Sequence, residues 1–145
     1  MSLEARNRTV IEAAFAKFRA TEFAIIRQGM INIAQAGLLY LVDAHEIFNL
    51  QDSHNHLNED NTLAWAVAYN GQTVDCGDLQ GSTDDESYPG DASAEARALL
   101  KETTGWVAVI YSSMEGWYRF DWEEMYLRYT RDMIYADFDR IFKRV

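Results

Sequence analysis

The stretch TLAWAVAYNGQTV, residues 62–74, decides the fold of this chain. Large apolar residues alternate in it with alanines, and a period of two predicts a strand with one bulky and one nearly flat face. The large residues are Leu63, Trp65, Val67 and Tyr69, and the small ones are Ala64, Ala66 and Ala68. Asn70-Gly71 supplies the two positive-φ residues of a type I′ turn. The stretch therefore predicts a β-hairpin, with Tyr69 opposite Gln72 and Val67 opposite Val74.

Helical patterns flank this hairpin in the sequence. Apolar residues recur at helical spacing through residues 4–46, and no proline interrupts them. A straight helix of that length would exceed about 60 Å. We therefore expect a break near Thr21 or Gly29, or an N-terminal part that projects and packs on another subunit.

The second half of the chain predicts one more strand and two more helices. Ser93 is placed to cap a short helix over 94–103. Residues 106–111 are apolar on both faces, which predicts a central strand covered on both sides. Asp121 and Glu124 form a capping-box pattern that begins the last helix. A single apolar stripe then runs to the end of the chain through Ile134, Phe138, Ile141 and Val145.

These elements predict a single α+β domain over residues 1–145. We expect a long N-terminal helix, a small antiparallel or mixed sheet of three or four strands, and a short helix. A long C-terminal helix should pack beside the first on the bulky face of the sheet.

Composition narrows the possible partners. The formal net charge is −10, and such a surface repels phosphate, which argues against nucleic-acid binding and against docking on an anionic membrane. No apolar run approaches the ~20 residues of a membrane span. Cys76 is the single cysteine, so no internal disulfide forms, as suits a reducing cytosol.

Two segments carry residues suited to metal binding. His54 and His56 point the same way in an extended segment, and a nearby carboxylate such as Asp52 would complete a metal site. Histidines in a polar loop are more often solvated. The acidic loop over 77–91 lacks the spacing of an EF-hand, and nothing near Cys76 would activate it as a nucleophile. We expect no metal, no cofactor and no catalytic residue.

An aromatic cluster is the best candidate for an interaction site. Its members flank a predicted turn, and not all of them can be buried. Exposed tryptophan and tyrosine beside arginine suit a protein–protein contact. The residues concerned are Trp117, Tyr118, Arg119 and Trp122.

The order of elements resembles that of the neck or tail-completion family of tailed bacteriophages, found in virions and prophages. Two short segments add to the resemblance: Asn49-Leu50-Gln51-Asp52-Ser53 before the hairpin, and Ser113-Met114-Glu115 after the last strand. Leu50 and Ser53 hold the places expected in the family, whereas Phe48-Asn49 replaces its Thr-Gly pair. Ser113 stands where the family has glycine, and Trp117-Tyr118 stands where it has Tyr-Ala.

The resemblance implies assembly without catalysis. Members of the family form rings between head and tail, and a flat exposed hairpin face, an acidic surface and a projecting helix would suit a ring subunit. The expected partners are further copies of this chain or neighbouring virion structural proteins, in the virion or in the cytoplasm of a bacterial host. Two alternatives stay open: a small metal-binding protein or enzyme using His54 and His56, and an acidic inhibitor or regulator of a basic partner.

Overall fold

The computed structural model describes residues 2–47, 63–78, 81–82, 92–112 and 120–143, with the backbone alone at 45–47, 81–82, 112 and 120–125. The helices are α1 (Leu3–Ile47), α2 (Ala92–Leu99), α3 (Phe120–Ala136) and α4 (Phe138–Phe142). The strands are β1 (Leu63–Tyr69), β2 (Gln72–Asp78), β3 (Gly81–Ser82) and β4 (Trp106–Ser112).

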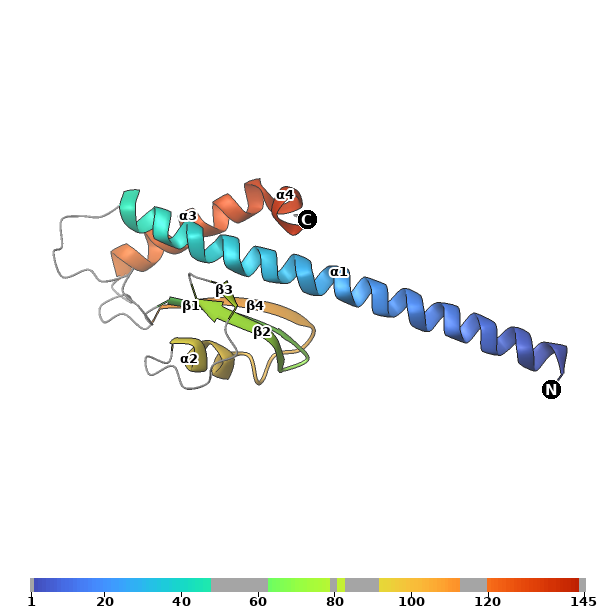
Figure 1. The fold of residues 1–145 in the computed structure, drawn as a ribbon. Coiled ribbons are helices and arrows are strands. Elements are labelled where there is room, and N and C mark those ends of the chain that lie inside the picture. Colours follow the sequence, from blue (N-terminus) through green and yellow to red (C-terminus); the bar gives the residue numbers. More distant parts are fainter. Residues whose placement is uncertain (1, 48–62, 79–80, 83–91, 113–119, 144–145) are drawn as a thin grey trace.

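The sheet is antiparallel throughout and has the strand order β3-β2-β1-β4. Helices α1 and α3 lie side by side over one face, and α2 lies on the other (Figure 1). The predicted α+β architecture is therefore confirmed, with a long N-terminal helix and C-terminal helices packed against the rest of the fold.

The hairpin closes as its sequence predicts, but it contains an irregularity. Asn70 has φ 50° and Gly71 has φ 81°, and Tyr69 faces Gln72. The register then shifts, so that Val67 faces Asp75 instead of Val74. Val74 is the extra residue of a β-bulge, which leaves its backbone outside the ladder. The predicted pairing of Val67 with Val74 is wrong for this reason.

Both faces of β1 are buried, each against a different partner. Leu63, Trp65 and Val67 join the main core with α1 and α3 residues. The alanine face joins a second cluster, which holds Ala64, Ala66, Ala68, Cys76, Ala92, Ala96 and Leu100. The prediction of an exposed flat hairpin face is wrong, because α2 covers it. Alanine meets alanine across this contact, so helix and sheet approach closely.

Strand β4 is covered on both faces, as its sequence predicts, but it lies at an edge of the sheet. Trp106, Ala108 and Ile110 pack against the main core, and Val107 and Val109 pack against the second cluster. The central position belongs to β1, which pairs with both β2 and β4. Apolar residues on both faces of a strand indicate that other elements pack on both faces. They do not indicate how many strands pair with it in the sheet.

The shorter helices differ in extent from their predictions. Helix α2 begins at Ala92, so Ser93 lies inside it, and it ends at Leu99. The expected single C-terminal helix is two helices, because α3 ends at Ala136 and α4 begins at Phe138. Helix α3 begins one residue before Asp121, and the side chains of the predicted capping box lie outside the described residues.

Helix α1 has no break at Thr21 or Gly29, because its glycines serve close contacts. A Cβ atom on Gly29 would overlap the ring of Phe142 in α4. A Cβ atom on Gly37 would lie 3.3 Å from Cδ1 of Ile134 in α3. The two glycines therefore let the C-terminal helices approach α1.

Candidate interaction surface

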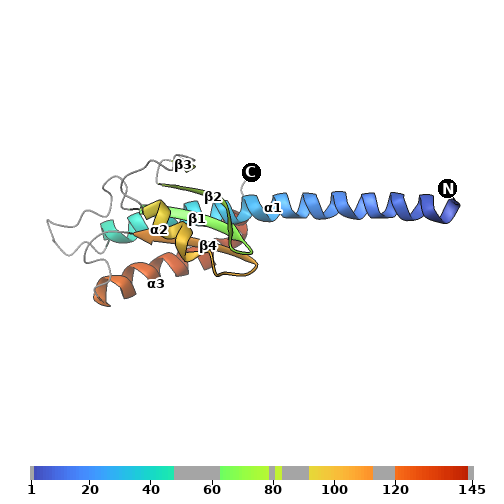
Figure 2. The same ribbon diagram turned by 90° about the horizontal axis from the view of Figure 1, so that it is seen from below.

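The first half of α1 extends alone beyond the hairpin end of the sheet (Figures 1 and 2). Every residue from Ser2 to Ile25 is exposed. We call residues 3–25 the projecting segment, which measures roughly 35 Å at the usual helical rise. We expected either a break in α1 or an N-terminal part that projects, and the structure shows an N-terminal part that projects.

Large apolar side chains line one side of the projecting segment. At about 100° per residue they fall within roughly 140° of one another around the helix axis. This apolar stripe consists of Leu3 (73% exposed), Val10 (68%), Ile11 (53%), Phe15 (59%), Phe18 (59%) and Ile25 (59%). A contiguous apolar surface of this kind on a folded protein marks an interaction site.

An aromatic trio fixes the point where α1 leaves the fold. The Phe23 ring centroid lies 4.7 Å from that of Trp106 and 5.2 Å from that of Tyr69, and the latter two lie 4.9 Å apart. These residues come from α1 and from the paired ends of β1 and β4. Phe23 therefore faces the sheet, whereas the apolar stripe lies on another side of the helix.

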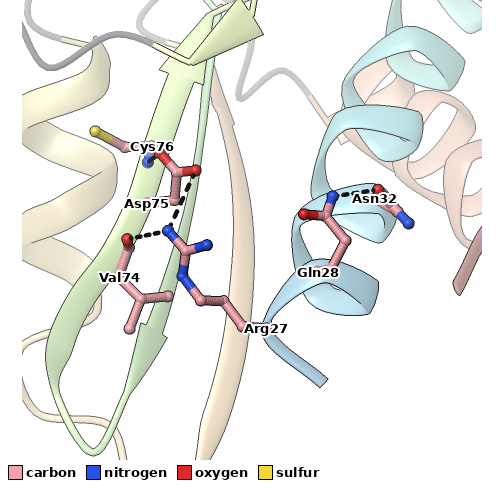
Figure 3. Close-up of polar contacts among 6 residues, drawn as sticks. All are labelled: Arg27, Gln28, Asn32, Val74, Asp75 and Cys76. Carbon is pink, nitrogen blue, oxygen red and sulfur yellow. Dashed lines mark hydrogen bonds and ion pairs between the residues drawn. The ribbon is translucent and has the colours of Figure 1, made fainter. Parts of the chain in front are cut away.

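A polar contact one turn further along ties α1 to the bulge in β2 (Figure 3). Arg27 Nη2 donates to the Val74 carbonyl oxygen at 3.2 Å and lies 3.8 Å from Asp75 Oδ2. The other carboxylate oxygen of Asp75 accepts from the Cys76 backbone N–H at 2.8 Å. The bulge thus turns a carbonyl out of the ladder, and α1 uses it as an acceptor.

Helix α4 covers α1 immediately beyond the projecting segment. Phe142 lies over Gly29, and its carbonyl oxygen accepts from Asn32 Nδ2 at 3.4 Å. Gln28 Nε2 donates to Asn32 Oδ1 at 2.9 Å and orients this amide (Figure 3). The cover of α1 by its own chain therefore begins at Gly29 on this side.

The junction between α3 and α4 is tied to α1 by Asp137. Its Oδ2 accepts from Arg140 Nη2 at 2.6 Å and from the Tyr40 hydroxyl at 3.4 Å. The hydrogen bond from Arg140 is the main reason that the pKa of Asp137 is lowered. Partial burial, and then the charge of Asp137, raise the pKa of Tyr40. This trio therefore joins the two C-terminal helices to α1.

The interface residues predicted from sequence are not placed by the structure. Trp117, Tyr118 and Arg119 lie outside the described residues, and Trp122 belongs to α3 with its side chain outside them. The prediction that they form a contact surface stays a prediction. Sequence reasoning noted the helical spacing in this part of α1 and allowed that it projects and packs on another subunit, but it did not identify the bare stripe, since spacing alone does not distinguish a buried stripe from a bare one.

The candidates for chemistry are placed only in part. Cys76 is buried beneath α2 in the alanine cluster, as expected for a structural thiol. His54, His56 and most of the acidic loop over 77–91 lie outside the described residues. Among the residues that the structure describes, no group of three or more histidine, cysteine, aspartate or glutamate side chains is placed to hold a metal ion.

Helix α1 also meets a length and composition test for a membrane span. One window within Leu3–Ala44 is long and apolar enough, and 33% of it is buried in the fold. The core helix of a soluble protein passes the same test, so this is weak evidence for a span. The expectation that the chain has no membrane partner stays a prediction.

No protein-family model, no curated protein and no solved structure matches this chain.

Proposed function

We propose that this chain is a structural assembly subunit that acts by protein–protein association without catalysis, of the kind found in phage or prophage necks and tail-completion rings. The observation that carries the proposal is the bare apolar stripe of α1. The sheet already has helices on both faces, so the stripe is left over once the core is complete. Large apolar side chains held outside a finished core suit a contact with another protein.

Charge adds support to this reading. Residues 1–26 carry four basic and three acidic side chains, and the remaining residues carry the other nine basic and twenty acidic ones. An acidic body with a nearly neutral apolar arm suits ordered assembly, because the bodies repel one another while the arms do not. The place of action would be the virion or the cytoplasm of a bacterial host.

The proposal is tested by the effect of the aromatic cluster on assembly. Trp117→Ala and Trp122→Ala are expected to weaken association, measured by native mass spectrometry across protein concentration, more than they lower the urea midpoint of unfolding. Tyr135→Ala is a matched control, because Tyr135 is an aromatic residue exposed by 72% on α3. Unchanged assembly together with lost stability in the tryptophan variants would make the cluster part of the core and count against it as a contact surface, whereas a chain that stays monomeric across the whole concentration range would count against the proposal.

A further inference from the structure

Three rows of side chains, each with a seven-residue spacing, run along the apolar side of α1. Seven residues bring the helix back to within about 20° of the same direction, so each row is nearly straight. The first row is Glu4, Ile11, Phe18, Ile25 and Asn32; the second is Arg8, Phe15, Glu22 and Gly29; the third is Asn7, Ala14, Thr21 and Gln28.

The first two rows are covered at one end and bare at the other. Phe142 of α4 lies over Gly29 and contacts Asn32, which are the last members of these rows. The preceding members are exposed from Arg8 to Ile25. The chain therefore covers this side of α1 with one of its own helices up to Gly29, and a second helix would continue the cover toward the N-terminus.

The position of α4 determines the direction of that second helix if it comes from another copy. Two copies paired in parallel would bring both α4 helices to the same level on the facing sides of α1, where they would collide. Parallel pairing would also place two strongly acidic bodies side by side. Antiparallel pairing puts the bodies at opposite ends and lets the N-terminus of each copy stop where the α4 helix of the other begins.

One antiparallel register matches large residues with small ones. In this register the numbers of two facing residues in the apolar seam, one from each copy, sum to 32. Phe18 of one copy then faces Ala14 of the other. In the same register Ile11 faces Thr21, and Ile25 faces Asn7. Alternation of bulky and small residues across facing positions is the packing expected of paired helices.

The same register pairs opposite charges beside the apolar seam. The second row flanks the seam, and there the facing numbers sum to 30, two fewer than in the seam itself. Arg8 of each copy then lies beside Glu22 of the other, which gives two symmetric ion pairs, and Phe15 meets its own symmetry mate. On the opposite flank of the seam the facing numbers sum to 34, so Lys17 also meets its symmetry mate. This like-charge contact is outnumbered by the two ion pairs.

The area of the stripe suffices for a weak but specific contact. A large apolar side chain presents roughly 100 Å², so the six residues give roughly 600 Å² on each copy and about 1,200 Å² in total. That lies at the lower end of stable protein interfaces. We expect a dissociation constant on the order of 1–100 µM, because much of the gain from burying this apolar area is offset by the freedom lost on association.

We propose that a second copy of this chain pairs antiparallel with the projecting segment, in the register that sets Phe18 against Ala14 and Arg8 against Glu22. The inference rests on the proposed function, association without catalysis, and names its partner and its surface. The contact is isologous and closes as a dimer, so it is separate from any ring contact made through the bodies of the molecules.

The register is tested by exchanging its charges in the full chain. Sedimentation equilibrium at low salt should show a monomer–dimer equilibrium for the unaltered chain. Arg8→Glu or Glu22→Arg alone should weaken it about tenfold, and the two together should restore it. The two residues are too far apart on one helix to contact each other, so rescue can only arise between copies. Phe18→Glu should abolish the dimer, whereas Ala16→Glu, on the opposite exposed side, should leave it unchanged.

The direction is tested by oxidative cross-linking. Phe15→Cys lies at the symmetry axis and should form an intermolecular disulfide, whereas Ile25→Cys should not; the reverse result would establish parallel pairing and overturn the proposal. A chain that stays monomeric at about 100 µM, or one that remains monomeric but binds phosphatidylcholine vesicles through Phe18, would also overturn it. Association that Phe18→Glu leaves intact would refute this surface while the proposed assembly function stands.

Discussion

Ala66→Val tests whether α2 seals the alanine face of the sheet. Ala66 is fully buried in β1, with Cys76 and Val109 beside it on the neighbouring strands. Ala96 of α2 belongs to the same buried cluster. Valine adds two carbon atoms at a fully buried site, and overpacking of this kind costs about 1–3 kcal/mol. The preference of valine for strands offsets up to about 1 kcal/mol of that cost.

The net expectation is a loss of about 1–2 kcal/mol in the free energy of unfolding. Urea denaturation followed by tryptophan fluorescence should show a midpoint lowered by roughly 0.5–1 M, for a slope of about 2 kcal/mol/M. Thr73→Val is the matched control, since Thr73 is exposed on β2, and it should change stability by less than about 0.5 kcal/mol. On an open face, Ala66→Val would stabilise the protein; an unchanged or raised midpoint would therefore refute the placement of α2.

Three further predictions concern the packing of the C-terminal helices on α1. Gly29→Ala should destabilise the protein, because the new methyl group displaces the Phe142 ring. In a Phe142→Ala background the same change should stabilise it by about 1 kcal/mol, since alanine favours helix over glycine. Additive effects in a double-mutant cycle would contradict the contact. The pKa of Asp137 is lowered mainly by the hydrogen bond from Arg140. The carboxylate therefore stabilises the fold above its unfolded-state pKa, and this stabilisation is lost as pH falls through its folded-state pKa. With Asp137→Asn, the urea midpoint of unfolding should fall less steeply as the pH is lowered. The pKa of Tyr40 is raised mainly by burial. Its contribution to stability is therefore complete below the unfolded-state pKa of about 10 and is lost as pH rises through the higher folded value. Tyr40→Phe should remove one phenol with a raised pKa from an ultraviolet titration.

Much of the fold follows from local pattern. Three patterns depend only on residues close together in the sequence, and the structure confirms the elements that they predict. They are the alternation in residues 62–74, the Asn70-Gly71 turn and the apolar run at 106–111. The order of helices and strands, and their α+β arrangement, follow from the same patterns.

The errors concern contacts between distant segments. The bulge at Val74 matters because Arg27 of α1 needs its carbonyl group. The cover of Ala66 comes from α2, a short helix some 30 residues further along the chain. The turn at Asp137 separates two helices where its carboxylate accepts from Tyr40 of α1. No window of sequence around any of these residues contains its partner.

The candidate surface shows the same limit in another form. Helical spacing of Ile11, Phe15 and Phe18 is equally compatible with a stripe buried in the core and with one left bare. What separates the two cases is whether the remaining elements can reach it. The sheet lies beside the second half of α1 and reaches Phe23 at its hairpin end, and α4 ends over Gly29, so none of the described elements lies over the apolar stripe.

The bare half of α1 can still be helical without a partner, and this lowers the conformational-entropy cost of the proposed pairing. Residues that pack on the sheet meet the cost of helix nucleation, after which each further turn costs little. Several alanines on the side away from the stripe, among them Ala13, Ala16 and Ala20, favour that propagation. A preformed helix loses less conformational entropy on docking than a disordered arm would. An apolar stripe of modest area can therefore suffice for association, because little of its binding free energy is spent on ordering the chain.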